Sequence, residues 1–154
     1  MTKKILDKES ENDRFQIFLM NIDDVVDEFI EEAERLGFEF DFSEYSLDML
    51  ENYYLRRESE LNQDEKRKNA FIESAARYLG ETLIKNYGGD WALAIDDPKN
   101  FYYGLPIING HSKYGVDFCP HETFRMFTRR KTHGFLRKVI QNDINPVRLE
   151  LTPE

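Results

Sequence analysis

The chain has 154 residues, of which 40% are hydrophobic, 14% aromatic and 33% charged, and its formal net charge is −9. This composition predicts one folded domain over residues 1–154 and excludes a disordered or disulfide-stabilised chain, because the aromatic residues supply a core and Cys119 is the single cysteine. No apolar run approaches the roughly 20 residues of a membrane span and the N-terminus does not have the pattern of a signal peptide, so we expect a cytoplasmic protein.

The charge is distributed unevenly along the chain. Residues 1–60 contain 7 Lys and Arg against 18 Asp and Glu, whereas residues 61–154 contain 14 against 12. The basic residues gather near the C-terminus, at Arg125, Arg129, Arg130, Lys131, Arg137, Lys138 and Arg148. Such an arrangement either steers a charged partner or lets the two halves of the chain attract one another.

A long amphipathic helix is predicted from about Asp13 to Leu36, after a flexible tail over residues 1–12. Its apolar residues recur at helical spacing, and Gly37 follows its end. The opposite face carries a row of acids: Asp23, Asp24, Asp27, Glu28, Glu31, Glu32 and Glu34. This row is either a solvated surface or a binding surface for a basic protein, and we expect Asp24, Asp27, Glu28 and Glu31 to make the contacts.

Two further helices are predicted before the middle of the chain. Residues 38–42 alternate as a short extended segment, and a helix follows to about Ser59. The next helix, from about Asp64 to Tyr87, has apolar residues around half its circumference and is therefore expected to be central. Gly80 within it predicts the close approach of another backbone, and Glu81 is expected to pair with Arg77 and Lys85.

A three-stranded antiparallel meander is predicted after Gly88-Gly89. Its first strand begins at Trp91. Its other two strands, 101–108 and 111–118, are joined by Asn109-Gly110, because both residues tolerate the positive φ of a type I′ turn. In that register Gly104 lies opposite Gly115, at the centre of one sheet face.

This glycine-containing face is a second candidate for function. Tyr102, His111 and Asp117 border it and are the residues expected to contact a small molecule, either as a ligand or as a substrate. The three histidines lack the spacing of a metal site, and Cys119 is expected to be a buried thiol. The sequence therefore predicts no catalytic residue, no metal and no cofactor, and it favours a role other than that of an enzyme.

Two short helices are predicted near the C-terminus, from Pro120 to about Arg130 and after Gly134, followed by an edge strand at 147–151. Their basic and aromatic residues have the composition of a nucleic-acid contact, which makes them a third candidate surface. The overall acidity disfavours that role, because an acidic chain repels phosphates. The alternative is that these helices dock against the acids of the chain itself.

Three motifs between residues 38 and 127 resemble a loose group of small bacterial proteins of uncharacterised function. The motifs are Asp41-Phe42-Ser43-x-x-Ser46-Leu47-x-x-Leu50, Tyr78-Leu79-Gly80-Glu81 and Gly88-Gly89-x-Trp91. Some bacterial proteins of this size and acidity are immunity proteins that neutralise a cognate toxin, so the resemblance implies an immunity-like interaction protein and carries over no site residues. The expected fold is α+β, with long N-terminal helices packed on a small antiparallel sheet and two short helices behind it.

Overall fold

The computed structural model describes residues 4–145, which form a mixed fold of helices and an antiparallel sheet. In chain order the elements are α1 (Lys8–Arg35), α2 (Ser46–Leu61), α3 (Glu65–Tyr87), β1 (Asp90–Leu93), β2 (Pro106–Asn109), α4 (Pro120–Arg130) and α5 (Phe135–Ile144). The α+β prediction is confirmed at this level.

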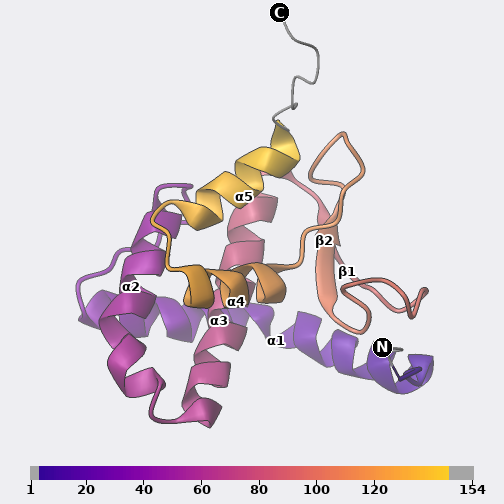
Figure 1. Ribbon diagram of the computed structural model, residues 1–154, viewed down its shortest axis with the longest axis horizontal. Helices are drawn as coiled ribbons and strands as arrows, with labels where there is room; N and C mark the ends of the chain where they lie inside the picture. Colours follow the sequence, from indigo (N-terminus) through magenta and orange to yellow (C-terminus); the bar gives the residue numbers. More distant parts are fainter. Residues whose placement is uncertain (1–3, 146–154) are drawn as a thin grey trace, which may run out of the picture.

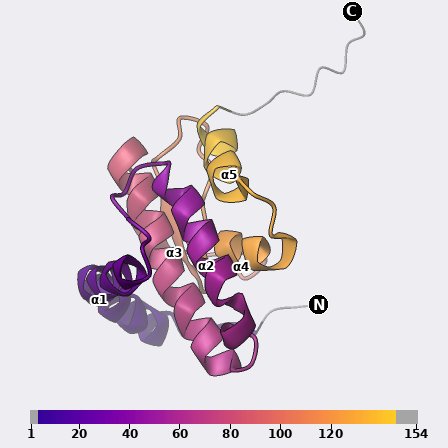
Figure 2. The same ribbon diagram turned by 90° about the vertical axis from the view of Figure 1, so that its left-hand side faces the viewer.

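The helices form three layers, and α3 lies in the middle one. Figure 2 shows α2 and α3 side by side in the middle, with α1 on one side of them and α4 and α5 on the other. The short sheet lies beside the N-terminal half of α1 (Figure 1). The acidic N-terminal helix and the basic C-terminal helices therefore lie on opposite sides of the molecule.

Helix α1 is longer than predicted, because it begins at Lys8 rather than near Asp13 and so includes part of the expected tail. Its buried residues recur at helical spacing and face the core: Phe15, Phe18, Ile22, Val26, Phe29 and Ala33. Near the sheet, the ring of Phe18 packs edge-on against Trp91, with 5.0 Å between the centroids. This inner stripe holds the helix in place and leaves its other face in solvent.

An aromatic cluster joins the first three helices. Phe29 is 4% exposed, and its ring centroid lies 5.3–5.7 Å from the ring centroids of Phe40, Tyr53 and Phe71. The alternation predicted for residues 38–42 is confirmed for burial, because Phe40 is buried while its two neighbours are exposed. The segment does not, however, form a strand. It is held instead by the Tyr78 hydroxyl, which accepts a hydrogen bond from the Phe42 N–H at 2.9 Å.

Helix α3 is central, as predicted, and its Gly80 is needed for the packing of a side chain rather than of a backbone. A Cβ at this position would lie 2.3 Å from Cζ2 of Trp91, so only glycine leaves room for the indole. The indole Nε1–H of Trp91 donates to Glu81 at 2.9 Å. The expected pairing of Glu81 is therefore wrong, because Arg77 pairs with Glu73 at 3.2 Å.

The predicted meander is replaced by a two-stranded sheet in the described part of the chain. Strand β2 pairs with β1, with Trp91 opposite Ile108, so the chain reverses between Leu93 and Pro106 rather than at Asn109-Gly110. After Gly110 the chain makes a wide loop before Phe118 forms an isolated bridge to Ile108. The expected two-residue hairpin, with its third strand, is thus wrong.

A tertiary contact explains why the chain does not turn back at Gly110. His111 is buried and its Nε2 lies 2.9 Å from Oδ2 of Asp143 on α5, while the Ser112 hydroxyl donates to the Asp143 carbonyl at 2.6 Å. These bonds direct the segment toward α5. As a result, Gly104 and Gly115 lie in two separate loops instead of opposite one another in a sheet.

The two C-terminal helices agree with the sequence prediction. Helix α4 begins at Pro120, whose ring suits the first turn, and α5 follows Gly134, whose φ of 84° disfavours any side chain. The edge strand predicted at 147–151 lies outside the described residues.

Candidate functional site

The acidic face of α1 comprises Asp24, Asp27, Glu28 and Glu31, and all four side chains are exposed. They point outward because the apolar stripe on the other side of the helix packs against α3 and β1. Figure 2 shows α1 as an outer layer, with no other helix on its far side. The structure therefore presents the four predicted partner-binding residues together on one accessible surface.

Among residues 4–145, no α1 acid from Asp23 to Glu34 takes part in an ion pair. Like charges at i,i+4 spacing, such as Asp24 with Glu28 and Asp27 with Glu31, each cost a few tenths of a kcal/mol. A cationic partner would relieve that repulsion and would thereby gain affinity.

The basic C-terminal helices place cations on α2 instead of on α1. Lys131, at the end of α4, pairs with Glu58 at 2.7 Å, and Arg137 of α5 pairs with Asp48 at 3.1 Å. For these two residues the alternative of docking against the chain's own acids is confirmed. Glu58 and Asp48 of α2 are thus paired internally, in contrast to the α1 acids from Asp23 to Glu34, which have no ion-pair partner among residues 4–145.

Glu51 anchors α5 from a distance of more than eighty residues in the chain. Its side chain is 1% exposed, and its two oxygens accept hydrogen bonds from the N–H groups of Gly134 at 2.8 Å and Leu136 at 3.0 Å. It therefore acts as the N-terminal cap of a helix that has no capping side chain of its own. Burial raises the pKa of Glu51, although the two N–H groups act in the opposite direction.

A hollow of about 370 Å³ lies between α1, α2 and α3, next to the acidic face. Glu28 and Glu32 form its α1 wall, Phe71 is among its apolar lining residues, and Arg57 and Arg67 face it from the other helices. Both arginines pair with Glu60, at 2.6 and 3.6 Å. The hollow extends the surface around Glu28 but holds charges of both signs.

The three residues expected to contact a small molecule lie in different environments. His111 is buried and contacts Asp143, and burial raises the pKa of the Asp143 carboxyl. Asp117, in contrast, is exposed. Tyr102 is half-buried beside the small cluster of Ala94, Ile107 and Cys119, and burial raises its pKa. The described hydrogen bonds and ion pairs of residues 4–145 include none between His111 and Asp117 or Tyr102.

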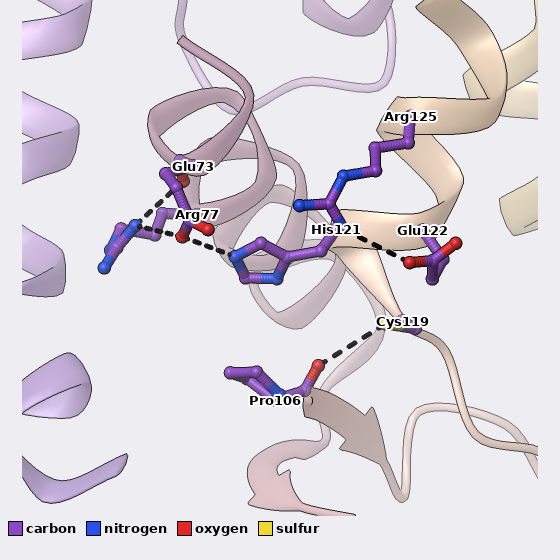
Figure 3. Close-up of polar contacts among 7 residues, drawn as sticks. All are labelled: Glu73, Arg77, Pro106, Cys119, His121, Glu122 and Arg125. Atoms are coloured by element: carbon purple, nitrogen blue, oxygen red, sulfur yellow. Dashed lines mark hydrogen bonds and ion pairs between the residues drawn. The ribbon is translucent and has the colours of Figure 1, made fainter. Parts of the chain in front are cut away.

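A partly buried polar cluster links α3 to α4 (Figure 3). His121, which is 3% exposed, points from α4 toward α3, where its Nε2 lies 2.8 Å from Oε2 of Glu73. Arg77 contacts the same carboxylate and lies over the ring of Phe18, 4.5 Å from its centroid. Sequence reasoning missed this cluster, although the i,i+4 spacing of Glu73 and Arg77 was a signal for half of it.

Cys119 lies near this cluster and has the environment of a structural thiol. It is 1% exposed, its Sγ–H donates to the Pro106 carbonyl at 3.7 Å, and burial raises its pKa to about 11. A thiol with so high a pKa carries almost no thiolate at neutral pH, so it is a poor nucleophile. The prediction of a buried Cys119 is confirmed.

The Glu73–His121 contact should make stability depend on acid pH. The hydrogen bond from His121 lowers the pKa of Glu73 below its ordinary value of 4.5. A carboxylate whose pKa is depressed on folding contributes stability above its unfolded pKa, and this contribution is lost as the pH falls through the folded pKa. The free energy lost in His121→Phe should therefore shrink as the pH is lowered below about 4.5.

Denaturant unfolding at several pH values would measure this effect, and a carboxyl-detected NMR titration should show the pKa of Glu73 rising in His121→Phe. Glu73→Gln is the control, because it removes the titrating group. A Glu73 pKa that is the same with and without the imidazole would contradict the assignment.

The described residues contain neither a metal-binding group nor a membrane-spanning segment. Between residues 4 and 145, no set of three or more His, Cys, Asp and Glu side chains is placed to hold a metal ion. None of the helices in this range combines the length and apolar character needed to cross a membrane. Comparison of the chain with protein-family models, with curated proteins and with solved structures found no match.

Proposed function

We propose that this chain is a protein-binding module that uses the acidic face of α1 to bind a basic protein. The observation that supports it is the contrast between the two groups of acids. Asp48 and Glu58 of α2 receive cations from the C-terminal part of the chain, whereas the α1 acids from Asp23 to Glu34 are exposed and have no ion-pair partner among the described residues. Complementary charge of this kind speeds association and selects partners.

The resemblance noted in the sequence extends this proposal to an immunity-like role. The partner is then a toxin with a cationic surface, and the acidic face covers that surface. A reading frame for a basic toxin adjacent to the gene for this chain would support the extension. The binding function stands without it, because it depends on the α1 surface alone.

The test is capture of a partner with matched charge variants. Extract of the source cells is passed over the immobilised wild-type chain, over a variant with Asp24, Asp27, Glu28 and Glu31 changed to Lys, and over a control with Glu39, Asp90, Asp96 and Asp117 changed to Lys. We expect a basic protein on the wild type and the control but not on the α1 variant. With that protein purified, the α1 variant should bind at least about tenfold more weakly at low salt.

Two outcomes would overturn the proposal. The first is equal affinity of the α1 variant and the control for the captured protein, because both carry the same change in net charge. The second is the absence of any basic protein from the wild-type eluate.

The other two candidate functions receive less support from the geometry. The small-molecule site was expected on a sheet face that the chain does not form, since Gly104 and Gly115 lie in separate loops. The nucleic-acid site depends on C-terminal cations, of which Lys131 and Arg137 are paired with acids of α2. We therefore do not advance either as the function.

A further inference from the structure

Two large apolar side chains of α1 face solvent beside the acidic face. Met20 is 78% exposed and Ile17 is 58% exposed, although the same helix buries Phe18 and Ile22. Single exposed apolar residues are common on protein surfaces. This pair is different because of its position relative to the acids.

The pair belongs to one continuous strip along α1. The exposed residues Asp13, Ile17, Met20, Asp24, Asp27, Glu31 and Glu34 follow one another at alternating intervals of four and three. That spacing keeps the side chains in one band along a helix, like the contact positions of a coiled coil, and the band drifts by about 20° per heptad. The strip therefore has an apolar segment at Ile17 and Met20 that continues directly into the acids.

We propose that Ile17 and Met20 are the apolar anchor of the acidic face, and that the partner contacts this strip with a helix. The partner helix carries Lys or Arg opposite Asp24, Asp27 and Glu31, and a large apolar residue opposite Ile17 and Met20. This inference rests on the proposed function, because it specifies the chemistry of the same partner. It adds that charge alone does not account for recognition.

The physical basis is that charged and apolar contacts contribute differently to binding at protein interfaces. Exposed ion pairs contribute little affinity because water screens them, whereas burying apolar side chains contributes about 25 cal/mol per Å². A helix that docks on regularly spaced apolar and charged positions is a common mode of recognition. The acids of the strip set the orientation of the partner, and the two apolar residues slow its dissociation.

The test uses two synthetic helical peptides of about 20 residues, each with Lys at heptad spacing along one strip. One peptide has two Leu at one end of the strip and the other has Ser at the same positions. Fluorescence anisotropy measures their affinities for the wild-type chain and for Met20→Glu, with Tyr45→Glu as the control. Tyr45 is 63% exposed and lies outside α1, so this control adds the same charge away from the strip.

We expect the Leu peptide to bind the wild type about tenfold more tightly than the Ser peptide, and Met20→Glu to remove this difference. Met20→Glu makes the strip more acidic, so a surface that acts through charge alone would bind both Lys peptides more tightly. That result, with equal affinities for the two peptides, would overturn the anchor and leave the proposed function intact. If neither peptide binds the wild type, or if reversing the four acids to Lys changes neither affinity, the helical partner and its anchor are overturned, whereas the capture experiment decides the proposed function separately.

Discussion

Replacing Phe29 by alanine should lower the free energy of unfolding by about 3–5 kcal/mol. The ring is 4% exposed and lies against Phe40, Tyr53 and Phe71, which come from the 38–42 segment, α2 and α3. Removing it leaves a cavity where three parts of the chain meet, and neighbouring aromatic rings are too rigid to fill it. Chemical denaturation followed by circular dichroism would measure the loss.

Met20→Ala is the matched control, because it shortens a large apolar side chain on the solvent side of the same helix. An exposed substitution of this kind should change stability by less than about 0.5 kcal/mol. A loss below 1 kcal/mol in Phe29→Ala would show that the aromatic cluster does not hold α1 to the core. Phe29→Ala leaves the acids of the acidic face unchanged. Its affinity for a basic partner, measured under conditions where the variant is folded, therefore tests whether the placement of these acids depends on the aromatic cluster.

Replacing Glu51 by alanine should cost about 3 kcal/mol, because two N–H groups at the start of α5 would lose their acceptors. Leu136 is 0% exposed, so water cannot readily replace the carboxylate at its N–H. Glu51→Gln retains one acceptor oxygen and should cost less. The loss should be greatest in α5, where amide hydrogen exchange would show the earliest opening.

Glu58→Ala is the control for this prediction, since it removes another α2 acid that contacts the C-terminal helices. Its ion pair with Lys131 is partly exposed on both sides and should be worth at most about 1 kcal/mol. If Glu51→Ala and Glu58→Ala cost the same, the two hydrogen bonds to α5 are not a cap of the kind described.

Local signals in the sequence were sufficient for most helices. The start of α4 at Pro120 and the glycine before α5 were visible because these residues restrict or permit particular backbone angles. The acidic face was also predictable, because helical spacing decides which residues share a side. The absence of ion-pair partners for this face among residues 4–145 was not predictable, since it depends on where the C-terminal helices dock.

The errors arose where distant segments meet. Asn109-Gly110 favours a tight turn, but a two-residue hairpin forms only if the next residues are free to pair, and His111 is drawn to Asp143 instead. Likewise, the spacing of Glu81 with Arg77 and Lys85 suggested ion pairs, whereas Trp91 supplies the partner. Glu51 and α5 are joined across more than eighty residues, a contact that no local pattern encodes.

The opposite placement of α1 and the C-terminal helices gives the molecule an electric dipole (Figure 2). Its negative end is the uncompensated side of α1, because the charge of α2 is partly cancelled by Lys131 and Arg137. In the electric field of a cationic partner such a molecule rotates before contact, so more of its collisions begin with α1 facing the partner. The rate at which encounters succeed should then fall with ionic strength, even where the lifetime of the complex does not.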